Sequence, residues 1–293
     1  MSIFSPFSEG NGKIPHKSPI PSKRTQLFLH VLSEKWTSII GLSLAYSLVL
    51  SPEILWMFVH LLFLERQASS ATLFSAGQLL LFASVLVILS IISGPGLAVL
   101  ARWSRDLARF RPLSPRHFVC QALKTCWKEG LILSFFSALL PILAVFAWIY
   151  LGAFQIGLLR TLLGAGLCLF FLLLFLLSPS LWSMAVTYQL SFSSMLVNAN
   201  YMTLRQFGKA VFIRFLSILP ELFSILLCLS NALSFDLVCS ALLAYYMFFG
   251  FGFRSILLAS FGNFLCETYL NPRIPGAGID IGLASERVTP RDV

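Results

Sequence analysis

The sequence predicts an all-α fold, a polytopic bundle of transmembrane helices with amphipathic helices on its cytoplasmic face. Three observations lead to this prediction. Hydrophobic residues make up 57% of the 293 positions and charged residues only 11%, less than half of the roughly 25% typical of soluble domains. Six stretches are long and apolar enough to cross a hydrocarbon core of about 30 Å. Almost all basic residues can be assigned to one side of these stretches.

The membrane domain is expected at residues 36–270, between two tails. Prolines, serines, glycines and lysines dominate residues 1–35, and prolines and glycines are frequent in 271–293, so both segments are expected to be flexible and cytoplasmic. The first apolar run begins too late and is too long for a secretory signal peptide. Pro52 and Glu53 interrupt this run, which either spans in full or ends early at the outer interface. The expected spans are 36–64, 72–93, 130–151, 157–178, 211–231 and 237–254.

The distribution of charge supports six crossings. With these spans, 19 of the 21 basic residues fall on one side, and only Arg66 and Arg160 lie in the opposite loops. A wrong number of spans would scramble this positive-inside pattern. It predicts a multi-pass protein with both termini in the cytoplasm. It also accounts for the net charge of +9, so the lipid bilayer is the expected partner and no nucleic acid is.

A helix break is expected at the end of the second span. Gly94, Pro95 and Gly96 follow one another there, and two glycines around a proline end a helix sharply. The break would let the chain turn from crossing the bilayer to lying on it. A phosphate-binding loop is the alternative, but the strand-loop-helix context and the lysine of such a loop are absent.

Two basic amphipathic helices are expected after the break. In residues 97–110 apolar side chains recur every three or four positions, and arginines occupy the other face. A second helix, at 115–128, begins at Ser114 and Pro115. Both either pack against the ends of the bundle or form a docking surface for anionic lipid or a partner protein. The residues expected on that surface are Arg102, Trp103, Arg105, Arg109, Lys124, Trp127 and Lys128.

A similar arrangement recurs downstream. Residues 191–209 form a third amphipathic stretch before the fifth span, so the order of inward span, surface helix and outward span with a proline occurs at 72–151 and at 157–231. Two such units in the same orientation are typical of the parallel repeats of some transporters.

Glu221 and Pro220 are the candidate intramembrane polar site. They lie about ten residues into the fifth span, where an ionisable group is costly and usually faces the bundle interior or a water path. Glu221 is either a proton- or cation-linked residue or a hydrogen-bonded acid that stabilises the kink at Pro220.

No motif for catalysis is found. The chain has no H-E-x-x-H, G-x-S-x-G or Walker A sequence, its four histidines are scattered, and its six cysteines form no C-x-x-C pair. We therefore expect no catalytic residues, no metal site, no cofactor and no enzymatic activity.

Several cytoplasmic segments together resemble the YesL family of bacterial membrane proteins. The run GPGLAVLAR from Gly94 to Arg102, the arginine-bearing helix after it, Phe118 and the stretch LKTCWK at 123–128 are similar to that family, as is MLVNA at 195–199. His117 and Cys126 stand where the family usually has aspartate and asparagine.

The resemblance covers about 72–270 and implies a bacterial plasma-membrane protein. Members of that family are often encoded beside carbohydrate ABC importers. This implies a non-enzymatic accessory or regulatory role in sugar uptake, with subunits of an ABC-type sugar transporter as partners. The alternative is a transporter or permease-like subunit with its own solute pathway, because Leu219 and Pro220 follow the helix near 195–209 as a Leu-Pro pair follows the coupling helix of ABC permeases.

Overall fold

The all-α fold class is confirmed. The computed structural model describes residues 21–67, 76–111, 115–152, 157–188, 190–230 and 234–288, and nearly all of them are helical. The exception is a short antiparallel ribbon in which Gly278 pairs with Val288 and Ile279 with Arg287. The remainder of each tail, 1–20 and 289–293, lies outside the described residues.

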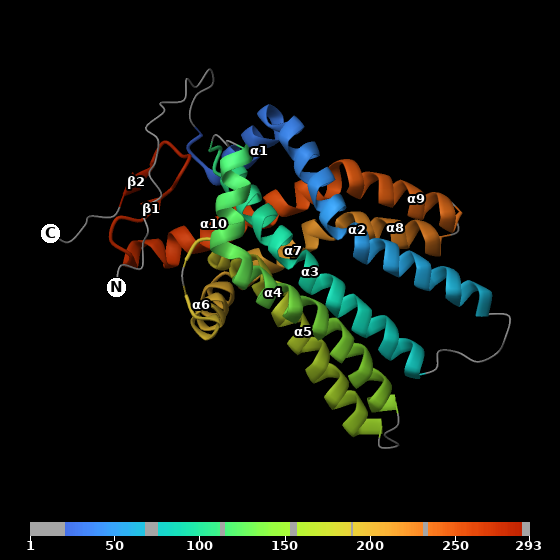
Figure 1. Ribbon diagram of the computed structural model, residues 1–293. Coiled ribbons are helices and arrows are strands. Elements are labelled where there is room, and N and C mark those ends of the chain that lie inside the picture. The colour runs from blue at the N-terminus through green and yellow to red at the C-terminus, as the bar shows by residue number, and fades with distance from the viewer. Residues whose placement is uncertain are drawn as a thin grey trace.

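In chain order the helices are α1 (Arg24–Glu34), α2 (Trp36–Gln67), α3 (Ala76–Ala108), α4 (Pro115–Gly152), α5 (Gly157–Ala185), α6 (Phe192–Arg205), α7 (Phe207–Ser217), α8 (Leu219–Leu229), α9 (Phe235–Tyr245), the π-helical turn η1 (Tyr246–Gly250), α10 (Phe251–Tyr269) and the 3₁₀ turn η2 (Asn271–Arg273). The strands are β1 (Gly278–Ile279) and β2 (Arg287–Val288). Figure 1 shows α2, α3, α4, α5, α8 and α9 extending toward one end of the molecule, while α1, α6 and the ribbon lie at the other.

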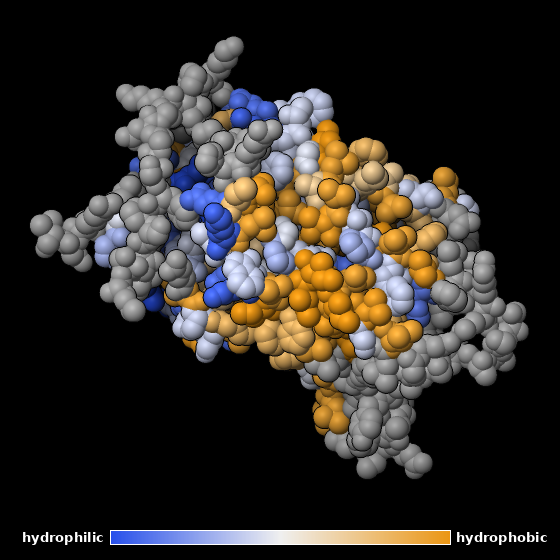
Figure 2. Space-filling view, in the orientation of Figure 1, coloured by the Kyte–Doolittle hydropathy of each residue, from blue (hydrophilic) through white to orange (hydrophobic). Residues whose placement is uncertain are grey.

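The protein has several helices suited to a membrane. Among the described residues four are long and apolar enough to cross one, namely Trp36–His60, Leu81–Ala108, Thr161–Ala185 and Leu237–Arg273, and the bent pair α7 and α8 would be a fifth. Large apolar side chains also face outward, as Leu48 and Leu229 do with 76% of their surface exposed. Figure 2 shows hydrophobic residues covering much of the described face. Such a surface suits lipid rather than water.

The first apolar run is one continuous helix. α2 passes through Pro52 without ending and reaches Gln67. Proline is tolerated inside a membrane helix because neighbouring groups can satisfy the backbone carbonyl that it leaves free.

The helix break expected at Gly94, Pro95 and Gly96 is wrong, because α3 continues through all three residues to Ala108. The glycines instead allow close packing. A Cβ atom on Gly94 would lie 2.8 Å from the carbonyl oxygen of Gly130 on α4, and one on Gly130 would lie 2.5 Å from that of Gly94. A Cβ on Gly96 would lie 3.0 Å from the side chain of Val49 on α2.

The two basic helices expected after the break are therefore not separate elements. Residues 97–108 are the last part of α3, and residues 115–128 are the first part of α4, which runs on without interruption. Of the three expected amphipathic stretches only the third, at 191–209, contains a helix of its own, α6, and α7 begins within the same stretch. The α6 residues Met195, Ala199 and Met202 are buried.

Parts of both tails differ from the flexible segments that composition predicts. Residues 24–34 form α1, and the sixth apolar stretch continues to Tyr269 through η1 and α10. After it, Ala277, Ile281 and Leu283 are buried. The backbone N–H of Ala284 donates to the carbonyl of Pro21 at 3.0 Å, so the two ends of the described chain are joined.

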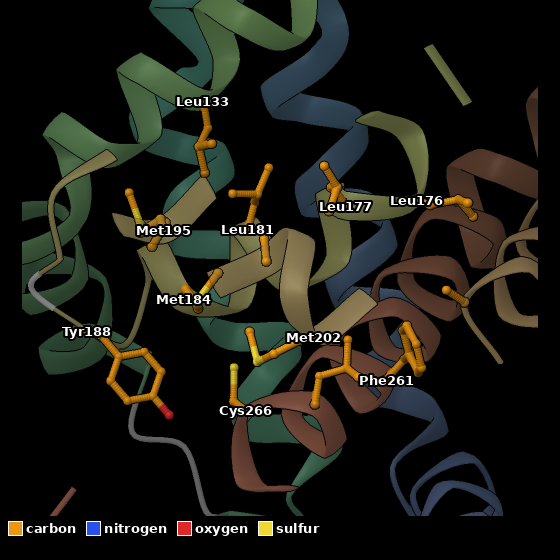
Figure 3. Close-up of a cluster of buried hydrophobic side chains, with 14 residues drawn as sticks. Leu133, Leu176, Leu177, Leu181, Met184, Tyr188, Met195, Met202, Phe261 and Cys266 are labelled. Atoms are coloured by element: carbon orange, nitrogen blue, oxygen red, sulfur yellow. The ribbon is translucent and has the colours of Figure 1, made fainter. Parts of the chain in front are cut away.

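The two larger of three buried clusters in the described residues join most of the helices. Figure 3 shows the larger, to which α5 contributes Leu181 and Met184, α6 contributes Met202, and α10 contributes Phe261 and Cys266. A second cluster joins α1, α2, α3 and α10 through buried leucine, isoleucine and valine side chains. α10 belongs to both clusters, which makes it the central helix of the fold.

Candidate functional site

The fifth apolar stretch is a broken helix. α7 ends at Ser217 and α8 begins at Leu219, and their axes differ by 53°. Pro220 lies in the first turn of α8, where its missing N–H costs nothing, and Glu221 follows it there. The unpaired N–H groups of a helix N-terminus favour a carboxylate at this position.

The opposite wall comes from the sixth apolar stretch, which changes helix type at η1. The hydroxyl of Ser43 on α2 donates to the carbonyl of Tyr246 at 2.9 Å and accepts from the N–H of Gly252 at 3.1 Å. A Cβ atom on Gly252 would lie 2.3 Å from the carbonyl oxygen of Ile39, so the backbones of α2 and α10 are in close contact. π-helical turns are rare and occur often at functional sites.

An ion pair joins these two irregular elements. Nη1 of Arg254, in the first turn of α10, lies 2.9 Å from Oε1 of Glu221, and about 30% of each side chain is exposed. The pair lines an open groove of about 390 Å³ whose other walls are mainly apolar, formed by Ile54, Cys239, Leu242, Leu243, Tyr246 and Phe251. We call this cavity the Glu221 groove.

Two polar atoms in the Glu221 groove have unused hydrogen-bonding capacity. Oε2 of Glu221 and the hydroxyl of Tyr246 are both buried and make no hydrogen bond of normal geometry to a described residue, although Tyr246 lies close enough to Glu221 and Arg254 to interact with both. Buried polar atoms are nearly always paired, so each such atom calls for an explanation. A ligand that carries both donors and acceptors could pair with the carboxylate, the phenol and the guanidinium of Arg254 together.

The sequence identified one half of this site. It singled out Glu221 and Pro220, which the structure places in the groove wall and at the bend, but it counted Arg254 among the cytoplasmic charges and passed over Tyr246. The signal for Arg254 was available, since this arginine stands inside an apolar stretch that continues well beyond residue 254.

Two of the three predicted α3 arginines are buried in the bundle rather than exposed on a surface. Arg105 and Arg109 are only 6% and 4% exposed. Nε of Arg105 donates to Oδ1 of Asn263 at 2.8 Å, and Arg109 donates to Oε1 of Glu267 through Nη2 at 2.8 Å and Nε at 3.1 Å. The expectation failed because α3 remains within the bundle, where α10 supplies polar partners that periodicity within α3 cannot reveal.

Glu267 is the centre of this buried charge cluster. Its Oε2 forms an ion pair with Arg24 of α1 and accepts from the backbone N–H of Ile281 at 3.2 Å. Close by, the Tyr188 hydroxyl donates to Oδ1 of Asn271, and burial raises the pKa of that hydroxyl above its ordinary value. The cluster connects α1, α3, α10 and the segment that leads into β2, and its burial indicates a structural role.

The other predicted docking residues remain accessible. Lys124, Trp127 and Lys128 are exposed on the first part of α4, and Nζ of Lys128 lies 5.7 Å from the centre of the Trp127 ring. Arg102 of α3 donates to the Thr125 hydroxyl at 3.1 Å, which joins it to this face, and Trp103 is half-buried. The predicted surface therefore divides into an exposed α4 face and a buried pair of arginines.

Within the described ranges, no group of three or more His, Cys, Asp or Glu side chains could hold a metal ion. The comparisons with known proteins add no identity: no protein-family model, no curated protein and no solved structure matches this chain. The fold and its surface define an all-α protein with apolar helices compatible with a membrane, and any narrower assignment depends on the site itself.

Proposed function

We propose that the protein is a non-enzymatic, six-span membrane protein in which the Glu221 groove binds a small polar solute as part of a pathway through the helix bundle. The observation that carries this proposal is the Glu221–Arg254 pair, two charges between mainly apolar walls with a buried carboxylate oxygen left for a ligand. Charged residues in membrane helices are costly, and they commonly mark substrate or ion pathways. Broken helices supply such sites in many transporters.

Six crossings follow if α4 is counted with the other candidates. The crossing elements would be α2, α3, α4, α5, the bent pair α7–α8 and the continuous run α9–η1–α10. At 1.5 Å per residue, the 38 residues of α4 extend about 57 Å, more than a hydrocarbon core of about 30 Å requires. An even number of crossings agrees with the hydrogen bond between Ala284 and Pro21, which needs both ends of the chain on one side.

Reconstituted liposomes test the pathway. We expect the wild-type protein to conduct protons, followed with a trapped pH-sensitive dye, or to take up radiolabelled glucose, and we expect Glu221→Gln and Arg254→Gln to lose that flux. Glu286→Gln is the matched control, because this carboxylate is exposed and lies far from the groove in sequence. Equal flux in all four proteins would show that the pathway does not pass through the Glu221 groove. If the wild type carries neither protons nor glucose, the proposed pathway is rejected for both.

A second candidate function is an accessory role in an ABC-type carbohydrate uptake system of the bacterial plasma membrane. The observation in its favour is the exposed α4 face with Lys124, Trp127 and Lys128, together with the resemblance of this segment to the YesL family. Cationic and aromatic side chains on an exposed helix suit recognition of a partner with acidic and apolar groups.

Crosslinking in membranes, followed by purification in mild detergent, tests the accessory role. The wild-type protein should recover subunits of a sugar ABC transporter, and the variant Lys124→Gln, Trp127→Ala, Lys128→Gln should not. A control variant with Lys23→Gln and Lys35→Gln removes two charges from the ends of α1 and should behave as wild type. Recovery of the protein alone would reject the accessory role.

A further inference from the structure

A second basic surface lies where α6 meets the end of α10. Arg205, Lys209 and Arg273 are all exposed there, contributed by α6, α7 and η2. Figure 1 shows α6 beside the C-terminal part of α10, at the end of the molecule that carries the ribbon. We call these three residues the α6 basic site.

Aromatic rings hold the cations in place. The guanidinium groups of Arg205 and Arg273 lie 5.0 and 6.0 Å from the centre of the Tyr201 ring, and Nζ of Lys209 lies 4.7 Å from that of Phe264. Cation–π contacts at these distances are attractive and leave the N–H groups free to bind an anion. Contacts of this kind favour one arrangement of the cations before any ligand arrives, which reduces the entropic cost of binding.

A side-chain hydrogen bond fixes the geometry beneath the cations. Gln206, which joins α6 to α7, donates from Nε2 to the hydroxyl of Tyr269 at 2.7 Å. The ring of Tyr269 in turn packs edge-on against Tyr201, with centroids 6.2 Å apart. α6, α7 and α10 thus present the site as one surface.

The charge of the α6 basic site is not compensated locally. No Asp or Glu occurs in the sequence between Glu129 and Glu221, a stretch that includes all of α5, α6 and α7. The nearest acid along α10, Glu267, is 1% exposed and already paired with Arg24 and Arg109. An anion can therefore approach the three cations without repulsion from α6 or α7.

Apolar side chains continue directly from the cations. Val197, Leu204 and Phe207 are exposed by 67%, 54% and 46%, on the same two helices as Arg205 and Lys209. A ligand that satisfies both surfaces carries a negative headgroup and a hydrocarbon chain. A free anion would satisfy only the cations, and a zwitterionic lipid would bring a positive charge toward them.

We propose that the α6 basic site binds the phosphate headgroup of an anionic phospholipid from the cytoplasmic leaflet, with the acyl chains against the exposed apolar face of α6 and α7. This inference rests on the membrane arrangement of the proposed function but not on its solute binding or accessory role, because neither the Glu221 groove nor the α4 face contributes to the site. Basic residues near anionic lipid each gain about a fivefold preference, so three together favour the anionic over the neutral lipid on the order of 100-fold.

Native mass spectrometry of the full chain, purified in nonionic detergent, tests the proposal. Dioleoyl phosphatidylglycerol and dioleoyl phosphatidylcholine are added at equal concentration, and the retained lipid is counted for each protein. We expect the wild type to retain phosphatidylglycerol, and we expect Arg205→Gln, Lys209→Gln, Arg273→Gln to lose most of this preference. The variant Arg205→Lys, Arg273→Lys keeps the charge and should keep most of the binding.

The matched control is Lys23→Gln, Lys35→Gln, Arg111→Gln, which removes the same charge from the two ends of α1 and from the residues just after α3 and should retain phosphatidylglycerol as the wild type does. Equal loss in both triple variants would overturn the proposal, because it would indicate a general attraction to a positive surface. Competition by inorganic phosphate at the concentration of the lipid would also overturn it in favour of a free-anion site. Unchanged melting temperatures show that a loss of binding is not a loss of fold.

Discussion

Replacement of Glu267 by glutamine should cost more stability than any other single change of one acid to its amide in the described chain. The carboxylate is 1% exposed and faces Arg109 at 2.8 and 3.1 Å, with Arg24 and the Ile281 N–H on its other oxygen. Glutamine keeps the shape but removes the charge, which leaves the Arg109 guanidinium buried without its counter-ion. Removal of one partner of a buried pair costs about 3–5 kcal/mol.

This loss can be measured as a melting temperature in detergent. For a chain of this size about 2 °C corresponds to each kcal/mol, so Glu267→Gln should melt roughly 6–10 °C below the wild type. Glu286→Gln is the control, because it alters an exposed carboxylate that accepts from the Gly282 N–H at 3.0 Å, and it should shift the midpoint by no more than about 1–2 °C.

A double-mutant cycle with Arg109→Gln then measures the interaction energy between Glu267 and Arg109 apart from their contacts with other residues. The double variant should lose at least about 1 kcal/mol less than the sum of the single losses, because the second change removes a charge that the first left unpaired. The reasoning is refuted if Glu267→Gln and Glu286→Gln melt together, or if the losses of the two single variants simply add.

Three further predictions concern packing, topology and pH. Gly252→Ala should lower the stability measured in thermal melts by about 1–3 kcal/mol, since its Cβ would lie 2.3 Å from the Ile39 carbonyl oxygen. The control Gly166→Ala, with no atom within 4 Å, should leave the stability unchanged or raise it by up to about 1 kcal/mol. Equal effects of the two changes would contradict the close contact of α2 and α10. Cys120 is exposed near the start of α4, so in a variant whose other five cysteines are replaced by alanine a membrane-impermeant maleimide should label it in inverted vesicles and not in intact cells; labelling from outside would reverse the proposed orientation. Because the pKa of Tyr188 is raised in the folded protein, its ionisation opposes folding, and stability should fall as pH rises above about 10. Tyr188→Phe should reduce this fall in melts measured at a series of pH values. Parallel curves for the two proteins would exclude the tyrosine as the cause.

The helical fold class was predictable because it depends on composition and on the length of apolar runs, which each segment carries in itself. The residues at which each helix begins and ends were not predictable in this way. Gly94, Pro95 and Gly96 have the local chemistry of a helix end, and only Gly130 on α4, opposite Gly94, reveals why the helix continues. Local sequence cannot predict this contact, because it joins two residues on different helices.

The same limit applies to the candidate sites. Glu221 stood out because an acid in an apolar run is improbable without a role. The sequence places Arg254, its partner, in the cytoplasm, because the sixth apolar span is predicted to end at residue 254, whereas the apolar helical run continues to Arg273. Arg105 and Arg109 were placed on a surface by the 100° periodicity of α3, although Asn263 and Glu267, each 158 residues further along the chain, draw them inside.

That separation of 158 residues has a consequence for biogenesis. At synthesis rates of about 5–20 residues per second, the α3 arginines wait roughly 8–30 s before the ribosome supplies their partners on α10. In the proposed six-span arrangement, α2 to α5 would enter the bilayer during this time with the α3 arginines unpaired at the cytoplasmic end, a placement of charge that the positive-inside rule favours for orientation. Only α10 supplies Glu267, which neutralises Arg109, and Asn263, which accepts a hydrogen bond from Arg105, and the two ends of the described chain then meet at Pro21 and Ala284. Charges that direct insertion early would thus become the closing contacts of the finished protein, so a truncated chain would reach the membrane correctly oriented but unable to complete its fold.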